Sequence, residues 1–215
     1  MQGKIFQLNN NKQTIYIFFI MLFFTLSLHL LISYLQVNHQ KQFAESLLTK
    51  AENISNDIVA SIQEVATLSP NRCDSDSINT LRIILSKYEY THDLGLIFDG
   101  KVGCSANWGL FETPILFARE FYSSSSGYQF ASKVGNIFPV PARYDITKKD
   151  NVIAFTINEP FKSFDHLEKG FSYKIISKNE SHTFHNYKSE YQFKKDTLLN
   201  SQELKICSSK FEYHG

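Results

Sequence analysis

Cysteine is the residue type in this chain whose spacing suggests covalent chemistry. The three cysteines are Cys73, Cys104 and Cys207, and all of them follow a long apolar segment near the N-terminus. Outside a bacterial cytoplasmic membrane the compartment is oxidising, and thiols there tend to pair. A bridge between Cys73 and Cys104 would remove roughly 3–4 kcal/mol of unfolded-chain entropy. Three thiols leave the connectivity open, and Cys207 is either a buried apolar side chain or a competitor for pairing.

Other residues that could act in catalysis form no recognised pattern. His182 and His185 are three apart, and residues with that separation on a strand point to opposite faces, so we expect no shared metal ion. The sequence contains no Gly-x-Ser-x-Gly elbow, no glycine-rich phosphate loop and no Glu-Ala-Leu signature. Trp108, near Cys104, either lines a ligand pocket or packs against the core, and packing is expected. We therefore expect a domain that is not an enzyme and that holds no cofactor.

The apolar segment near the N-terminus predicts a membrane anchor. It runs from Ile15 to Leu35 without a formal charge, and about 20 helical residues cross the hydrocarbon core of a bilayer. No small-residue cleavage pattern follows it, which favours a retained transmembrane helix over a signal peptide. Lys4 and Lys12 precede the segment and place the N-terminus in the cytoplasm by the positive-inside rule. The expected layout is a cytoplasmic tail at 1–14, a transmembrane helix at 15–35 and a periplasmic domain at 36–215.

Behind this segment, apolar residues recur in steps of three or four. Such spacing places them on one face of a helix. They are Phe43, Leu47, Ala51, Ile54, Ile58, Ile62 and Val65. The helix is expected to end near Leu68, because Pro70 disfavours helical geometry in the residue before it. The apolar face either packs against the core of its own domain or forms a dimer seam that continues the membrane helix.

The remaining sequence predicts a second helix followed by a sheet. The helix begins with Asp76 or Ser77 as its N-cap and runs to Tyr88. The dipeptide Asp99-Gly100 then separates two short segments and indicates a hairpin of residues 94–98 and 101–105. Further strands are expected at 128–134, 152–157, 171–176, 183–187 and 204–207. Helices followed by antiparallel-looking strands indicate one domain of the α+β class.

The order of these features resembles a bacterial sensor family. Residues 73–109 read CDSDSINTLRIILSKYEYTHDLGLIFDGKVGCSANWG, and they resemble the CSS-motif domain of cyclic di-GMP phosphodiesterases. The likeness lies in a transmembrane helix, an amphipathic helix, a first cysteine, a short helix with Leu-Arg and a hairpin, followed by Cys104, Ser105 and Gly109. Ala106 stands where the family name expects a serine. The literal Cys-Ser-Ser triplet at 207–209 is interpreted as a coincidence, because no hairpin precedes it.

The resemblance implies a periplasmic redox sensor. In that family two periplasmic cysteines, matched here by Cys73 and Cys104, form a disulfide that restrains a cytoplasmic EAL phosphodiesterase domain, and reduction relieves the restraint. A second transmembrane helix and the EAL domain normally follow, and neither occurs before Gly215, so a truncated family member is expected. A signal would travel through the helix from Ile15 to Val65. The implied partners are the inner membrane, the periplasmic thiol oxidation machinery, and a second copy of the chain or a full-length EAL-domain relative.

The composition leaves other functions open. A formal net charge of +1 offers no large basic field for nucleic acid, so none is expected as a partner. The disulfide could be purely structural, in a periplasmic module that binds a small ligand. A nonfunctional gene fragment is the remaining alternative.

Overall fold

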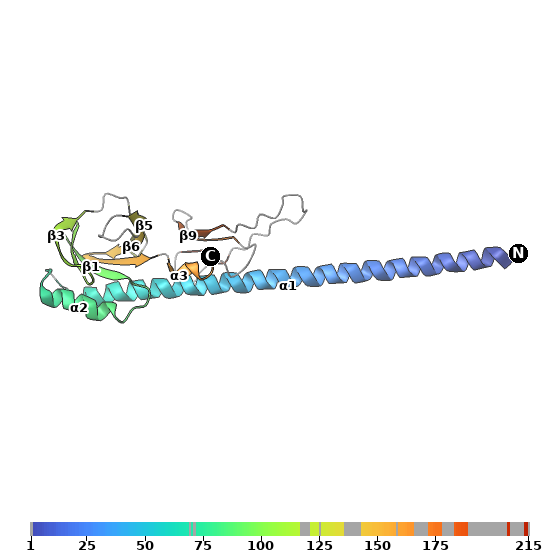
Figure 1. Ribbon diagram of the computed structural model, residues 1–215, viewed down its shortest axis with the longest axis horizontal. Coiled ribbons are helices and arrows are strands. Elements are labelled where there is room, and N and C mark those ends of the chain that lie inside the picture. Colours follow the sequence, from blue (N-terminus) through green and yellow to red (C-terminus); the bar gives the residue numbers. More distant parts are fainter. Residues whose placement is uncertain are drawn as a thin grey trace. The chain divides into compact units, whose positions relative to one another are not determined.

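The computed structural model describes residues 2–68, 70, 72–116, 121–124, 126–135, 143–157, 159–165, 172–177, 183–188, 206 and 213–214. The chain divides into two compact units, Met1–Ala44 and Glu45–Gly215. Helix α1, Gln2–Leu68, contributes to both units, and all other elements belong to the second (Figure 1).

The first unit is an apolar helical segment. Large apolar side chains are exposed from Ile15 to Val37, among them Phe19 and Leu31. A helix that is apolar on every side is typical of a membrane span. By length and composition, α1 contains one stretch that is able to cross a bilayer.

In the second unit, α1 buries the predicted apolar face. Six of the seven predicted positions are buried, namely Leu47, Ala51, Ile54, Ile58, Ile62 and Val65. Ile62 and Val65 are each only 1% exposed, and they belong to the same core cluster as Leu81 of the next helix and Leu94 of the sheet. Packing against its own domain is therefore the role that these residues have. The helix ends at Leu68, as predicted.

Helix α2, Ser75–Leu85, has the predicted length of about three turns but begins and ends earlier than predicted. Its N-cap is Asp74, whose carboxylate accepts a hydrogen bond from the Ser77 backbone N–H at 2.8 Å. The prediction of Asp76 or Ser77 as the cap was wrong. Residues 74–77 are all good capping types, and the extended backbone of Asp74 decides among them. The helix also ends before the predicted Tyr88, because Ser86 is followed by a turn.

The main sheet is antiparallel and seven-stranded, in the order β3-β2-β1-β7-β6-β5-β4. Its strands are β1 Asp93–Phe98, β2 Lys101–Ser105, β3 Gly109–Ile115, β4 Tyr122–Ser123, β5 Gln129–Gly135, β6 Arg143–Lys149 and β7 Val152–Ile157. The predicted hairpin is confirmed as β1 and β2. Its turn residues have positive φ, 49° at Asp99 and 75° at Gly100, as a type I′ turn requires.

Three strands of this sheet, β3, β4 and β6, were not predicted. β3 is largely exposed and carries Pro114, which an edge strand tolerates. A second sheet has the order β10-β8-β9, with β8 Tyr173–Ser177, β9 Thr183–Tyr187 and β10 Tyr213–His214. A short helix, α3, spans Glu159–Lys162. Of the strand predicted at 204–207, only Ile206 lies within the described residues.

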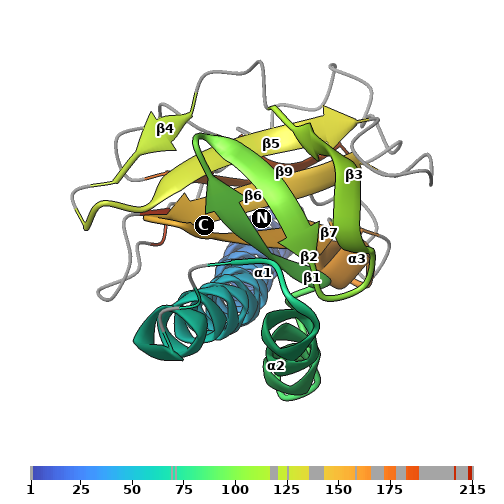
Figure 2. The same ribbon diagram turned by 90° about the vertical axis from the view of Figure 1, so that its left-hand side faces the viewer.

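The main sheet has apolar side chains on both faces. Leu94, Leu96 and Ala154 belong to the cluster that contains α1 and α2 residues, whereas Ile153 and Phe155 belong to a second cluster. Successive strand residues point to opposite faces, so the two clusters lie on the two sides of the sheet. Figure 2 shows α2 and the end of α1 on one of these sides. The architecture confirms the α+β class.

Candidate functional site

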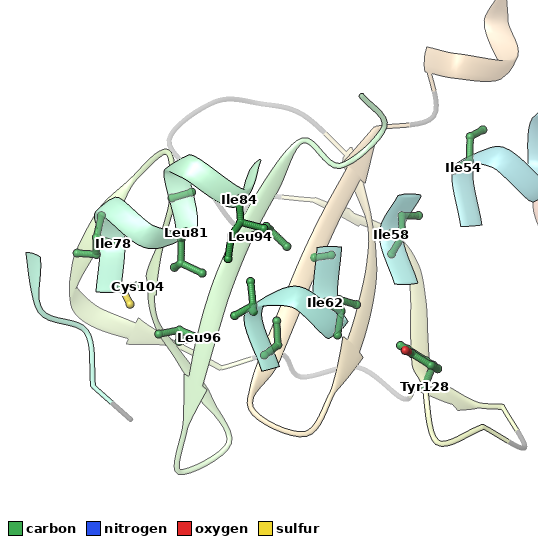
Figure 3. Close-up of a cluster of buried hydrophobic side chains, with 14 of the residues drawn as sticks. Ile54, Ile58, Ile62, Ile78, Leu81, Ile84, Leu94, Leu96, Cys104 and Tyr128 are labelled. Carbon is green, nitrogen blue, oxygen red and sulfur yellow. The ribbon is translucent and has the colours of Figure 1, made fainter. Parts of the chain in front are cut away.

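A disulfide joins Cys73 to Cys104, with 5.8 Å between the two Cα atoms. Cys73 lies between α1 and α2, and Cys104 lies in β2 with no exposed surface. The side chain of Cys104 points into the core cluster that also holds Ile78 and Leu81 of α2 (Figure 3). The bond therefore connects the helical layer to the sheet.

Two glycines, Gly95 and Gly103, allow close contacts around the two bonded cysteines. A Cβ atom on Gly103 would lie 3.3 Å from Sγ of Cys73 and 3.2 Å from the Phe98 ring. A Cβ atom on Gly95, in the neighbouring strand, would lie 2.8 Å from the carbonyl oxygen of Cys104. Sequence reasoning missed both glycines. The signal that would have found them is a glycine inside a strand pattern, which often marks a close approach of backbone or ligand.

Ser105 and Gly109 shape the chain just after the disulfide. Ser105 is fully buried, and its Oγ accepts a hydrogen bond from the Trp108 backbone N–H at 3.2 Å. Gly109 pairs with Ser105 across β2 and β3 and has a φ of 73°, which favours glycine. The predicted motif residues Cys104, Ser105 and Gly109 thus form the end of β2 and its return into β3.

Asp93 is a buried carboxyl group beside this return. Its Oδ1 accepts hydrogen bonds from the backbone N–H groups of Leu94 at 2.9 Å and Asn107 at 3.0 Å. Its Oδ2 makes no hydrogen bond of regular geometry in the part of the chain that the structure describes. Burial raises the pKa of Asp93, and the Ser105 hydroxyl and the two N–H groups offset part of that effect. Sequence reasoning did not single out Asp93, because its position at the start of a strand gives no sign of complete burial.

Ala106 departs from the family motif in its side chain only. The residue is fully buried, and its N–H donates to the carbonyl oxygen of Leu94 at 2.8 Å. Its own carbonyl oxygen accepts a hydrogen bond from Nε of Arg82 in α2, also at 2.8 Å. The third motif position therefore acts through its backbone here, as a second connection between α2 and the β2–β3 return.

Polar side chains of α1 hold the segment between α2 and β1. Oδ2 of Asp57 accepts hydrogen bonds from the backbone N–H groups of Tyr90 at 2.8 Å and Thr91 at 3.1 Å. The Tyr88 hydroxyl donates to Glu64 at 2.8 Å, and burial together with this carboxylate raises the pKa of Tyr88 to about 12. A displacement of α2 or β1 is thereby coupled to α1.

Other residues considered from the sequence have different outcomes. Trp108 is 37% exposed, so the expected packing in the core is incomplete. His185 lies in β9, and its Nε2 is 3.0 Å from Oδ1 of Asp165. His182 and Cys207 lie outside the described residues.

Comparison with known proteins identifies a family. Residues 37–211 match the model of the CSS motif domain associated with EAL. No EAL domain is detected in this chain. No curated protein and no solved structure gives a significant match. Because the matched region covers most of the chain and contains both bonded cysteines, the resemblance seen in the sequence is confirmed, and the chain belongs to the CSS-motif family.

Proposed function

We propose that this chain is a membrane-anchored periplasmic input domain of the cyclic di-GMP phosphodiesterase type, with the Cys73–Cys104 disulfide as its switch. The observation that carries the proposal is the position of the bond. It joins the α1–α2 connection to a buried strand, 31 residues apart in sequence, so opening it frees a connection between two layers. The family association with EAL links the domain to cyclic di-GMP signalling.

The switching reaction is a thiol–disulfide exchange with a dithiol of the periplasmic redox machinery. Cys73 is partly exposed and Cys104 is fully buried, so the incoming thiolate attacks Sγ of Cys73. The Sγ–Sγ bond breaks, its electron pair goes to Cys104, and that sulfur takes up a proton. The second thiol of the reductant then resolves the mixed disulfide and releases Cys73. The disulfide gains two electrons and two protons, and the reductant becomes a disulfide.

Reduction would act on α1 through α2 and the β2–β3 return. Without the covalent bond, the hydrogen bond from Arg82 to Ala106 still joins α2 to that return. The contacts of Asp57 and Glu64 transmit a shift of the following segment to α1. Toward the N-terminus, the same helix α1 contains the apolar segment that is able to cross a membrane. In this proposal the helix carries the signal inward.

The orientation and partners are part of the proposal. Lys4 and Lys12 place the N-terminus in the cytoplasm, so the cysteines lie on the oxidising side of the inner membrane. The enzymatic output requires an EAL domain, supplied by a full-length relative that pairs with this chain. A homodimer is an alternative assembly.

Thiol labelling in intact cells tests the switch. A Cys207→Ser background removes the third thiol, and a membrane-impermeant maleimide then reports on Cys73 and Cys104. Both should be blocked in cells with an intact thiol-oxidising pathway; in cells that lack it, Cys73 should be labelled directly, and the buried Cys104 should be labelled after denaturation. If both cysteines are blocked in both strains, the disulfide is a permanent structural bond and the proposed switch is excluded.

A second measurement tests the output. Cells that express the chain together with a full-length EAL-domain relative should contain less cyclic di-GMP when the chain carries Cys73→Ser and Cys104→Ser. The Cys207→Ser variant is the matched control, since it removes a cysteine without opening the bond. Equal cyclic di-GMP in both strains would contradict the proposed link to the phosphodiesterase.

A further inference from the structure

A cavity of about 70 Å³ lies within the second unit between α1 and the strands. α1 contributes Ala51, Ile54 and Ile58 to its wall, and Figure 3 labels the last two. Strands of both sheets and α3 provide the remaining wall. The cavity is partly open, so a molecule can enter without unfolding the domain. It shares no lining residue with the disulfide site.

The lining favours an aromatic molecule. Three phenylalanine rings face the cavity from different elements, Phe130 of β5, Phe161 of α3 and Phe184 of β9. Phe130 and Phe184 already form an edge-to-face pair, with ring centroids 6.1 Å apart and planes at 87°. Aromatic rings prefer this arrangement with one another, and a further ring can add to it.

The polar groups of the lining are few and uncharged ones dominate. Ser55 of α1 makes no side-chain hydrogen bond to any residue that the structure describes. Thr156 is already engaged, because its hydroxyl donates to the carbonyl oxygen of Asp145 at 3.2 Å. The hydroxyl of Ser55 is therefore available for a ligand. An apolar wall that also includes Asp145 disfavours an anion, since burying a negative charge without a partner and near a carboxylate is costly.

We propose that this cavity binds a small uncharged aromatic molecule with one hydrogen-bonding group, of the phenol or indole class. A closed apolar cavity of about 150 Å³ holds benzene, so this smaller, partly open cavity encloses only part of one ring, and the polar end of the ligand stays in the open mouth. Ser55 is the partner of that polar group. The ligand replaces empty space beside α1 and favours the conformation in which α1 is packed on the sheet.

The site gives the domain a second input that is independent of the disulfide. A ligand that binds only the packed conformation stabilises it by mass action. Because α1 forms part of the wall, occupancy acts on the same helix that the redox proposal invokes, although from another place along it.

Isoleucine methyl NMR on the full chain in lipid nanodiscs tests the proposal. The probes are phenol and indole, with toluene to remove the polar group and benzoate to add a charge. Phenol and indole should shift the δ1-methyl signals of Ile54, Ile58 and Ile175, which line the cavity. The signal of Ile83, which is 63% exposed and outside the cavity, should not move. Methyl groups of the membrane segment report separately on probe that enters the lipid.

Two substitutions locate the binding site. Ala51→Leu places an isobutyl group in the cavity and should raise the dissociation constant of phenol by about tenfold or more, equivalent to about 1.4 kcal/mol. Ser55→Ala should weaken the binding of phenol and leave the binding of toluene unchanged. Ile54→Val enlarges the cavity with little risk to folding and should shift preference from phenol toward the larger indole.

Several results would overturn the proposal. They are the absence of methyl shifts with phenol and indole, benzoate binding as tight as phenol binding, or phenol binding that Ala51→Leu leaves unchanged. If Ala51→Leu does not fold, Ile54→Val decides: an unchanged ratio of indole to phenol affinity shows that the ligand lies elsewhere.

Discussion

Asp57 of α1 and Thr91, just before β1, are joined by a hydrogen bond of 3.1 Å from the Thr91 backbone N–H to Oδ2 of the carboxylate. The same oxygen accepts the N–H of Tyr90 at 2.8 Å. Next to this pair, the hydroxyl groups of Ser61 and Thr91 lie 3.2 Å apart, and both side chains are buried. One side chain of the long helix thus satisfies two consecutive backbone donors where the chain enters the sheet.

Replacing Asp57 with alanine should destabilise the domain by about 2–3 kcal/mol, because two backbone N–H groups lose a charged acceptor. Asp57→Asn keeps an acceptor oxygen and should lose less stability than Asp57→Ala. Denaturant unfolding followed by the fluorescence of Trp108, the single tryptophan, measures both. Asp76→Ala, in the exposed first turn of α2, is the control and should cost less than about 1 kcal/mol. Equal losses for Asp57→Ala and Asp76→Ala would contradict this role of Asp57.

Opening the disulfide should lower the free energy of unfolding by about 3–4 kcal/mol, because the unfolded chain regains the entropy of a closed loop. Reductant added to the Cys207→Ser chain should have this effect. The same chain with Cys73→Ser and Cys104→Ala should start at the lower stability and should not respond to reductant. An oxidised chain whose unfolding midpoint is unaffected by reduction would show that the bond does not restrain the domain.

Asp93 should make the domain less stable as the pH rises. Its pKa is raised in the folded state, so the folded protein holds this proton more tightly than the unfolded chain does. The stabilising contribution is complete below the unfolded pKa of 3.8 and is lost as the pH rises through the folded pKa. The contribution of Asp93 to the unfolding free energy should therefore decline between acidic and neutral pH, whereas Glu64 and Asp74, whose pKa values are lowered, contribute in the opposite sense.

Asp93→Asn isolates this effect, since asparagine keeps the Oδ1 acceptor for Leu94 and Asn107 but cannot ionise. Relative to the unmodified chain, the unfolding free energy of this variant should lack the decline with rising pH that Asp93 contributes. If the two pH profiles are parallel over the whole range, the titration of Asp93 does not contribute to stability.

Gly95→Ala should destabilise the domain by about 1–3 kcal/mol, as overpacking does in a closed core. The added Cβ would lie 2.8 Å from the Cys104 carbonyl oxygen, a backbone atom that β2 pairing holds in place. Gly103→Ala should cost less, because the atoms it meets are side-chain atoms of Cys73 and Phe98 at 3.3 and 3.2 Å.

Reduction distinguishes the two glycines. Once the disulfide is open, Sγ of Cys73 can move away, so the cost of Gly103→Ala should shrink while that of Gly95→Ala persists. The measurement is the unfolding free energy of each variant with and without reductant. A cost that reduction relieves equally at both positions would refute the separate contacts assigned to them.

Local patterns predicted those elements whose signals are confined to neighbouring residues. The apolar face from Leu47 to Val65, the turn at Asp99 and Gly100, and the strand at 152–157 all occur where they were expected. The helix cap was misplaced, because four consecutive residues have similar capping chemistry and only backbone geometry separates them. β3 and β6 were missed, since exposed or polar strands are stabilised by pairing with neighbours that are distant in the chain.

The sequence by itself determined that an apolar helix precedes an α+β domain of the CSS-motif family, because helical periodicity, turn residues and a motif are all properties of short segments. The family resemblance implied the pair Cys73 and Cys104, but the spacing of three thiols left it open until tertiary structure brought the two together. Tertiary structure alone decided that Asp93 is buried beside Ser105 and that α1 forms one wall of an aromatic cavity. The physical reason is that bonding, burial and enclosure depend on distances between atoms from different elements. Residue order does not contain those distances until the chain has packed.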